Sequence, residues 1–134
     1  MRLHIRYYFT IVSSLLILRL FSQDFTPIVN QFNKNDYRAA NQNWAVGQGA
    51  DGMMYFGNNN GLLQFDGAEW ELHKMPQNKI VRSILVINDI IYVGSYEEFG
   101  FFKKNLNGQL EYTSLSDSLK NYKMMNDEIW TISN

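Results

Sequence analysis

The chain has 134 residues, of which 46% are hydrophobic and 15% aromatic, and its formal net charge is −1. This composition is too apolar for a disordered chain, and the absence of cysteine excludes disulfide bonds and cysteine-ligated metal sites. All thirteen acidic residues but only nine of the twelve basic ones follow residue 23, so that part carries a net charge of −4. A mildly acidic chain gives no electrostatic footprint for nucleic acid, and we expect no direct contact with one.

Residues 1–23 have the pattern of a secretory signal peptide. A basic start precedes an apolar run at residues 7–21, and a polar, acidic chain follows. A membrane-spanning helix needs about 20 apolar residues, and Arg19 lies inside this shorter run. We therefore predict a cleaved signal and an exported protein, either periplasmic or secreted. An uncleaved anchor and a buried core helix are the alternatives. Residues 24–43 form a lead-in segment.

A short motif then occurs three times. It begins at Trp44, at Arg82 and at Trp130, with spacings of 38 and 48 residues. A second landmark, MYFG at residues 54–57, matches IYVG at residues 91–94, a spacing of 37. Repeats of about 40 residues that contain several short strands are typical of β-propeller blades.

Each full repeat contains four segments with the composition of a β-strand, because the apolar runs are short, β-branched or aromatic, and broken by Gly and Asn. The first blade, at about residues 44–75, has expected strands at 44–48, 53–57, 62–65 and 69–74. The second, at about residues 81–113, has them at 81–87, 90–94, 98–103 and 110–113. A polar link with a helical turn at 115–120 follows, and a third blade begins at about residue 128, with its first strand at 128–132.

The expected fold is all-β: a partial β-propeller of two four-stranded antiparallel blades and the start of a third, preceded by a signal peptide. Closed propellers have about four to eight blades, so an incomplete β-propeller over residues 44–134 predicts a fragment of a longer protein. A small complete domain that contains two similar sheets is the alternative.

The motifs carry a family resemblance. They are WAV at 44–46, GMMYFG at 52–57, GLLQFDG at 61–67 and VGSYEEFGF at 93–101, after the lead-in YRAANQNW at 37–44. Together they resemble the two-component regulator propeller repeat, and more narrowly the N-terminal part of Bacteroidetes periplasmic sensors. In that family a triple-tyrosine domain, a membrane helix and a helix-turn-helix or histidine-kinase output module follow. Arg82 departs from the repeat, which often has an aromatic or small residue there.

The resemblance implies an extracytoplasmic ligand-sensing propeller domain of a transmembrane signal-transduction or transcription regulator, dimeric at full length. Its partners would be a small ligand, with an oligosaccharide as one compatible class, the rest of its own propeller and the downstream domains. Because the residues show no catalytic constellation, we predict that the chain is not an enzyme. A fragment of a propeller-scaffold carbohydrate-active enzyme and a secreted interaction module without a signalling role are the alternatives.

Tyr96 and Glu97 are the candidate ligand-binding residues, in a link between two expected strands. Tyr96 would stack on a sugar ring, and Glu97 would accept hydrogen bonds from hydroxyl groups. We favour a structural or rim role for this loop, and ligand binding is the hypothesis for the case that a ligand reaches it. Adjacent carboxylates such as Glu97 and Glu98 point to opposite faces, so they do not form the facing pair of a glycosidase.

Three further features are interpreted as structural. The G-x-G-x-x-G pattern at residues 47–52 precedes an expected strand, whereas a dinucleotide site needs a helix there. His73 is the only histidine after the signal, so it gives neither a metal cluster nor a triad, and we expect it to be solvated. Trp44, Trp70 and Trp130 are expected to lie in the core. We predict no catalytic residue, metal site or cofactor.

Overall fold

The computed structural model describes residues 7–8, 12–13 and 26–134. The chain divides into two units, Met1–Gln31 and Phe32–Asn134. In the first unit, the residues described before 14 are helical, and residues 26–31 are exposed and have no regular secondary structure. Most of the predicted signal peptide at 1–23 lies outside the described residues. Among those that are described, no helix has the length and apolar character needed to cross a membrane.

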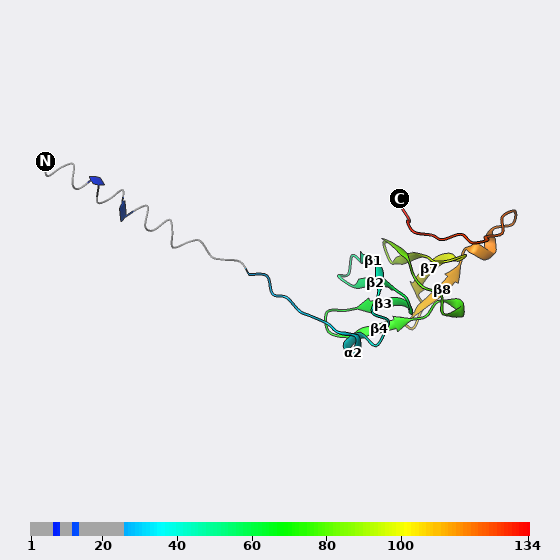
Figure 1. Ribbon diagram of the computed structural model, residues 1–134, viewed down its shortest axis with the longest axis horizontal. Coiled ribbons are helices and arrows are strands. Elements are labelled where there is room, and N and C mark those ends of the chain that lie inside the picture. Colours follow the sequence, from blue (N-terminus) through cyan, green and yellow to red (C-terminus); the bar gives the residue numbers. More distant parts are fainter. Residues whose placement is uncertain (1–6, 9–11, 14–25) are drawn as a thin grey trace. The chain divides into compact units, whose positions relative to one another are not determined.

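The second unit is described throughout and consists mostly of β-structure, in two antiparallel four-stranded sheets (Figure 1). The first sheet has the order β1 (Asn43–Gln48), β2 (Met54–Asn58), β3 (Gly61–Phe65) and β4 (Trp70–His73). The second has the order β5 (Ser83–Ile87), β6 (Ile90–Gly94), β7 (Phe99–Lys104) and β8 (Leu110–Ser114). Helix is limited in this unit to α2 (Lys34–Tyr37) and the short 3-10 turns η1 (Pro76–Asn78) and η2 (Ser116–Ser118). All eight strands expected in the two full repeats form, with bounds within two residues of the prediction.

The strand expected at 128–132 does not form in the described structure. An isolated antiparallel bridge pairs Glu128 with Tyr96, and the Ile129 N–H donates a hydrogen bond of 2.9 Å to the carbonyl of Ser95. The prediction of a strand was wrong because a regular ladder needs a neighbouring strand, and in the described chain these residues have only this bridge. The helical turn predicted at 115–120 is the shorter η2.

Local turn chemistry explains why the strands pair in sequence order. In the turn between β3 and β4, the Asp66 carboxylate accepts hydrogen bonds from the backbone N–H groups of Ala68 and Glu69, at 2.8 and 2.7 Å. These two donors lower the pKa of Asp66. Gly67 has a φ of 103°, a conformation that a residue with a Cβ rarely adopts. The hairpin predicted from this Asp-Gly pair is confirmed.

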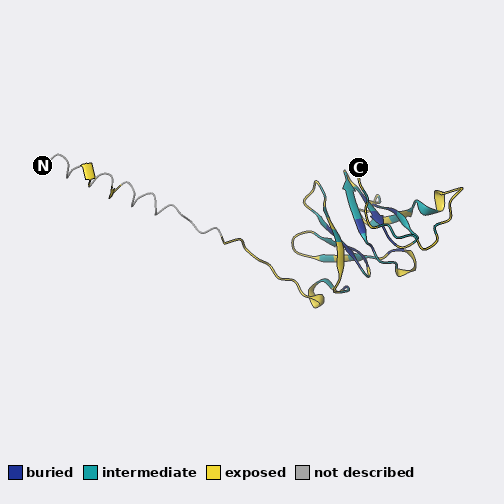
Figure 2. Ribbon diagram, turned by 45° about the horizontal axis from the view of Figure 1, so that its top comes forward, coloured by how far each residue is buried: buried dark blue, intermediate teal, exposed yellow. Residues whose placement is uncertain are grey.

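The main core lies between the two sheets. Its buried side chains come from both sheets and from the connection that joins them: Tyr55, Leu62, Met75, Val81, Ile91, Val93 and Phe102. Strands β1 and β5 lie close together, and a Cβ on Gly47 would lie 2.9 Å from the Cγ2 atoms of both Ile84 and Val86. Glycine at this position therefore allows the close approach. Figure 2 shows buried segments in the sheets and exposed residues at the turns.

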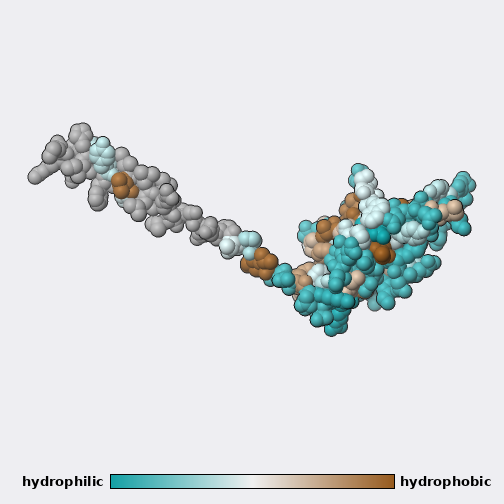
Figure 3. Space-filling view, in the orientation of Figure 1, coloured by the Kyte–Doolittle hydropathy of each residue, from teal (hydrophilic) through white to brown (hydrophobic). Residues whose placement is uncertain are grey.

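Each sheet also has a second, incompletely covered face. Leu85, Tyr92 and Phe101 are directly opposite one another in the ladders of the second sheet and alternate with its core residues, so they share the face that points away from the first sheet. All three are half-buried. In the first sheet, Val46 is 60% exposed. The surface seen in Figure 3 is mostly hydrophilic over the second unit, with small hydrophobic patches.

His73 is largely buried, so the expectation that it is solvated was wrong. Its side chain is 10% exposed, its Nε2 lies 3.1 Å from Gln64 Oε1, and its ring centroid lies 6.2 Å from that of Phe102 in the second sheet. Strand β4 is an edge strand, but His73 lies on the face that the second sheet covers. Burial lowers the pKa of His73, and the nearby carboxylate of Glu71 opposes this effect.

This lowered pKa predicts a pH dependence of stability. Because the unfolded histidine titrates at about pH 6.5 and the folded one at a lower pH, the unfolded state binds more protons as the pH falls through this window. The free energy of unfolding should therefore decrease below about pH 6.5. We expect His73→Gln to lose less stability than the unsubstituted chain between about pH 7.5 and 5.0. Urea unfolding of both proteins at the two pH values measures this, and equal losses would contradict the burial of His73.

Candidate functional site

The three repeat-equivalent residues Trp44, Arg82 and Trp130 meet in one cluster, which we call the Trp–Arg–Trp cluster. The Arg82 Cζ lies 4.6 Å from the ring centroid of Trp44 and 4.4 Å from that of Trp130. The two indole rings contact each other edge to face, with centroids 5.6 Å apart. The guanidinium is therefore in cation–π contact with two rings at once.

Val81 and Ile129, which precede Arg82 and Trp130, make equivalent backbone hydrogen bonds to the two sheets. The Val81 N–H donates to the carbonyl of Asn58 at the end of β2, at 3.1 Å. The Ile129 N–H donates to the carbonyl of Ser95, just after β6, at 2.9 Å. Asn58 and Ser95 are 37 residues apart, the same spacing as the β2 and β6 motifs, and both are fully buried. The segment at Ile129 therefore contacts the second sheet in the same way as the segment at Val81 contacts the first.

Glycines leave room for this docking. A Cβ on Gly57 would lie 2.8 Å from the carbonyl oxygen of Val81, and a Cβ on Gly94 would collide with the side chain of Ile129. Gly57 and Gly94 are the last residues of the two matching MYFG and IYVG motifs. The sequence landmark therefore marks the place where each sheet receives the first residues of the following repeat.

The cluster is partly open to solvent and contains one ion pair. Trp44 is 37% exposed and Trp130 is 53% exposed, so the expectation that these two residues lie in the core was wrong. Arg82 Nη2 lies 3.3 Å from Glu128 Oε1, and the two side chains are 14% and 30% exposed. Arg82 Nε is buried and has no hydrogen-bond partner in the described structure. The Trp44 Nε1–H donates to Asn59 Oδ1 at 2.6 Å.

Tyr96 and Glu97 lie next to this cluster, because Tyr96 forms the bridge to Glu128. The Tyr96 hydroxyl donates to Asn126 Oδ1 at 2.8 Å. Glu97 Oε1 accepts from the Asn126 N–H at 2.7 Å, and the Glu97 N–H donates to the carbonyl of Asp127 at 2.7 Å. Desolvation and then the charge of Glu97 raise the pKa of Tyr96, which is 38% exposed. In this structure the two candidate residues fasten residues 126–128 to the loop that follows β6.

The neighbouring carboxylate, Glu98, points to different partners. Its Oε1 accepts hydrogen bonds from the hydroxyls of Tyr112 and Ser114, both at 2.7 Å, and of Ser116 at 3.1 Å. Desolvation and the hydrogen bond to Glu98 raise the pKa of Tyr112. Glu97 and Glu98 thus have different hydrogen-bond partners. The glycine pattern at 47–52 is also followed by a strand, as expected, because it connects β1 to β2.

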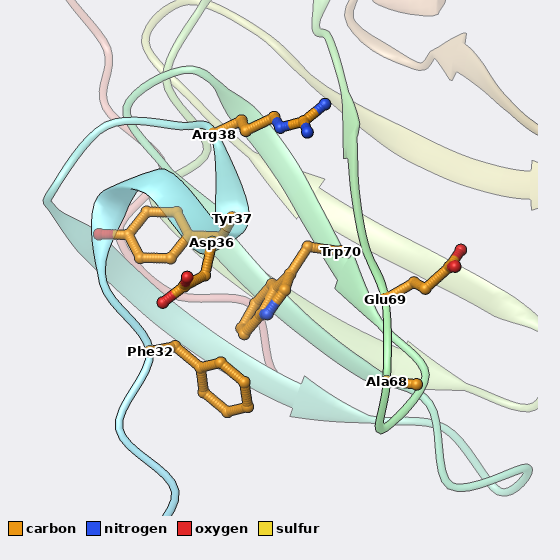
Figure 4. Close-up of a pocket in the computed structure, with 7 residues that line it drawn as sticks. All are labelled: Phe32, Asp36, Tyr37, Arg38, Ala68, Glu69 and Trp70. Carbon is orange, nitrogen blue, oxygen red and sulfur yellow. The ribbon is translucent and has the colours of Figure 1, made fainter.

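A separate pocket of about 560 Å³ lies between α2 and β4 (Figure 4). Its lining residues are Phe32, Asp36, Tyr37, Arg38, Ala68, Glu69 and Trp70. Trp70 is half-buried and stacks on Phe65 with centroids 4.3 Å apart, and its ring also contacts Phe32 and Tyr37 at 5.3 and 5.7 Å. Asp36 accepts a hydrogen bond from the Asn33 N–H in a helix cap. We interpret these contacts as a clamp that holds the lead-in segment on the first sheet.

The described residues contain no group of three or more His, Cys, Asp or Glu that is placed to hold a metal ion. No family model, curated protein or solved structure matches the chain. The function is therefore inferred from the repeat and from the geometry of the Trp–Arg–Trp cluster.

Proposed function

We propose that this chain is part of an extracytoplasmic, ligand-sensing β-propeller that belongs to a transmembrane signal-transduction or transcription regulator. In this proposal the two sheets are consecutive blades, and residues 128–132 lead into a third. The repeated docking of the chain after β2 and after β6 is the observation that supports it. A structural unit that recurs with the sequence repeat is the basis of a propeller. The half-covered outer faces of both sheets are the faces that neighbouring blades would cover.

The same arrangement supports a ligand site at the Trp–Arg–Trp cluster. Trp44 begins the sequence motif at β1, and Arg82 precedes β5 in the equivalent position. In a propeller, residues in equivalent positions beside the innermost strands gather around the central channel. Partly exposed aromatic rings with an ion pair beside them suit a small polar ligand, and an oligosaccharide is one compatible class. Tyr96 and Glu97 would border this site.

Signalling by such a site needs a ligand that binds two states of the protein with different affinity. A ligand with equal affinity for both states does not shift the equilibrium between them. Residues 126–130 connect the loop after β6 to the cluster. A ligand that changes this connection would change how the following blade is held. In a dimeric full-length regulator, that change would alter the geometry of the downstream domains.

A transcript measurement in the source bacterium tests the sensing role. The chromosomal gene is replaced by a Trp44→Ala/Trp130→Ala variant, with Leu106→Ala as a control at a residue whose side chain is fully exposed. Cells are grown on a panel of polysaccharides. We expect the double variant, at unchanged protein level, to lose induction of a gene set that the wild type and the control induce. Unchanged induction in the double variant would exclude this cluster as the sensing site.

An export assay tests the predicted location. The whole chain and a version without residues 1–23 are each fused to alkaline phosphatase, which is active only outside the cytoplasm. We expect activity from the first fusion and background activity from the second. Equal activity from both fusions would contradict the signal peptide and with it the extracytoplasmic sensor.

A further inference from the structure

We propose that the Trp–Arg–Trp cluster binds a carboxylate carried on a ring, such as a sugar acid, and that Glu128 occupies Arg82 when this ligand is absent. The inference rests on the proposed function, because it names the ligand class and the resting occupant of the same site.

The hydrogen-bond donors of Arg82 are incompletely satisfied. A guanidinium carries five N–H donors in a fixed plane. In the described structure its ion pair is with Glu128, through Nη2 at 3.3 Å, while Nε is buried without a hydrogen-bond partner. Nε and Nη2 form one edge of the guanidinium, and a carboxylate with both oxygens along that edge makes two parallel hydrogen bonds. Glu128 engages one end of this edge and leaves the other unsatisfied.

Contacts with both indole rings hold the guanidinium of Arg82 in place. The Arg82 Cζ lies 4.6 Å from the ring centroid of Trp44 and 4.4 Å from that of Trp130, so the guanidinium contacts both rings from one side of the pair. A guanidinium in contact with aromatic rings keeps the planar fork of N–H donors that matches a carboxylate. The rings of Trp44 and Trp130 are 37% and 53% exposed, so they also offer apolar surface to the body of a ligand. The cluster thus combines a pre-oriented fork with a surface on which a ring can stack.

Another anion can replace the carboxylate of Glu128 at Arg82. Its side chain is 30% exposed, twice the exposed fraction of the Arg82 side chain, so the carboxylate can return to water when another anion takes its place. Glu128 lies in the segment that Tyr96 and Glu97 fasten to the loop after β6. Displacement of its carboxylate therefore removes one of the contacts that hold residues 126–130. The ligand would gain an ion pair and at the same time change the connection to the next repeat.

Paired sugars test this inference on the full chain. D-glucuronate and D-glucose differ only in the carboxylate at carbon 6, and tryptophan fluorescence titrations with each report binding beside the indole rings. We expect glucuronate to bind at least about tenfold more tightly than glucose. Glu128→Gln should tighten glucuronate binding about threefold to tenfold, since it removes the competing charge. Arg82→Lys should weaken it at least about tenfold, since lysine lacks the planar fork.

Lys104→Gln is the matched control, because it removes another ion pair, with Asp51 at 3.5 Å, away from the cluster; it should leave binding unchanged. Circular dichroism verifies the fold of each variant. If Arg82→Lys is unfolded, the effect of Glu128→Gln on glucuronate binding tests the inference. Equal binding of glucose and glucuronate would overturn the carboxylate inference and leave the cluster as the sensor's ligand site. Binding of neither sugar, or glucuronate binding that is unaffected by Glu128→Gln, would also overturn the inference. The transcript measurement with the tryptophan variants decides the proposed function independently.

Discussion

Phe102→Ala is expected to lower the free energy of unfolding by about 3–5 kcal/mol, as is usual for truncation of a large buried aromatic residue. Phe102 is 2% exposed and lies in β7, in the core between the two sheets. Its ring contacts Tyr112 in the same sheet and His73 in the other, with centroids 5.1 and 6.2 Å apart. Truncation therefore leaves a cavity at the contact that joins the sheets. Urea unfolding, followed by tryptophan fluorescence, measures the loss.

Leu106→Ala is the control for this experiment, because Leu106 lies in the turn between β7 and β8 and is fully exposed. It should change the free energy of unfolding by less than about 0.5 kcal/mol. If Phe102→Ala were equally mild, the two sheets would not share a core. A biphasic unfolding curve in the unsubstituted chain would also contradict a shared core, because sheets with a common core unfold together.

Gly61→Ala is expected to lower the free energy of unfolding by about 2–5 kcal/mol, for two reasons that add. Gly61 has a φ of 133°, where an L-residue is strained by about 1–2 kcal/mol. A Cβ at this position would also collide with the carbonyl oxygen of His73 on the neighbouring strand β4. The backbone cannot move aside without breaking the β3–β4 ladder, so overpacking adds about 1–3 kcal/mol. Thermal unfolding measures the combined effect as a lower melting temperature.

Gly67→Ala separates the two contributions. Gly67 also has a positive φ, of 103°, but a Cβ there would meet nothing within 4 Å. We expect a loss of about 1–2 kcal/mol, from backbone strain alone. If Gly61→Ala and Gly67→Ala were equally destabilising, the close approach of β4 to Gly61 would be disproved.

The strands could be predicted because their signals are local. Short β-rich runs, the Asp66-Gly67 pair and the repeated motif ending in Gly57 and Gly94 fix the strands and the turns without knowledge of the rest of the molecule. The antiparallel order of both sheets follows from these short connections. The strand expected at 128–132 does not form because no partner strand lies beside it in the described structure, and the local sequence does not reveal whether such a partner is present.

The burial of individual residues could not be predicted in the same way. His73 lies on an edge strand, where alternation alone does not tell which face a second sheet covers. Trp44 and Trp130 are large aromatic residues of the kind often found in a core, yet they are 37% and 53% exposed, and their rings contact the charged side chain of Arg82. The repeat alignment contains a signal for the Trp–Arg–Trp cluster, because it gives Arg82 the same position as the two tryptophans. Equivalence in a repeat does not by itself imply contact, so the cluster emerges only from the structure.

Tyr96 and Glu97 are an aromatic and an acidic residue side by side in a loop, which is the sequence signal that made them candidates. The structure places them beside the cluster, but their polar atoms contact Asn126 and Asp127. Sequence spacing does not reveal such contacts, because almost 30 residues separate the two segments. Their role in ligand binding is still a prediction, and fluorescence titration of a Tyr96→Ala variant with glucuronate provides a way to test it.

The proposal that these two sheets are blades of a sensor is tested most directly by the nucleotide sequence that follows codon 134 in the gene. We expect an open reading frame with further repeats of about 40 residues, and then a span of about 20 apolar residues followed by an output domain. A stop codon directly after codon 134, or an open frame without such repeats, would contradict it.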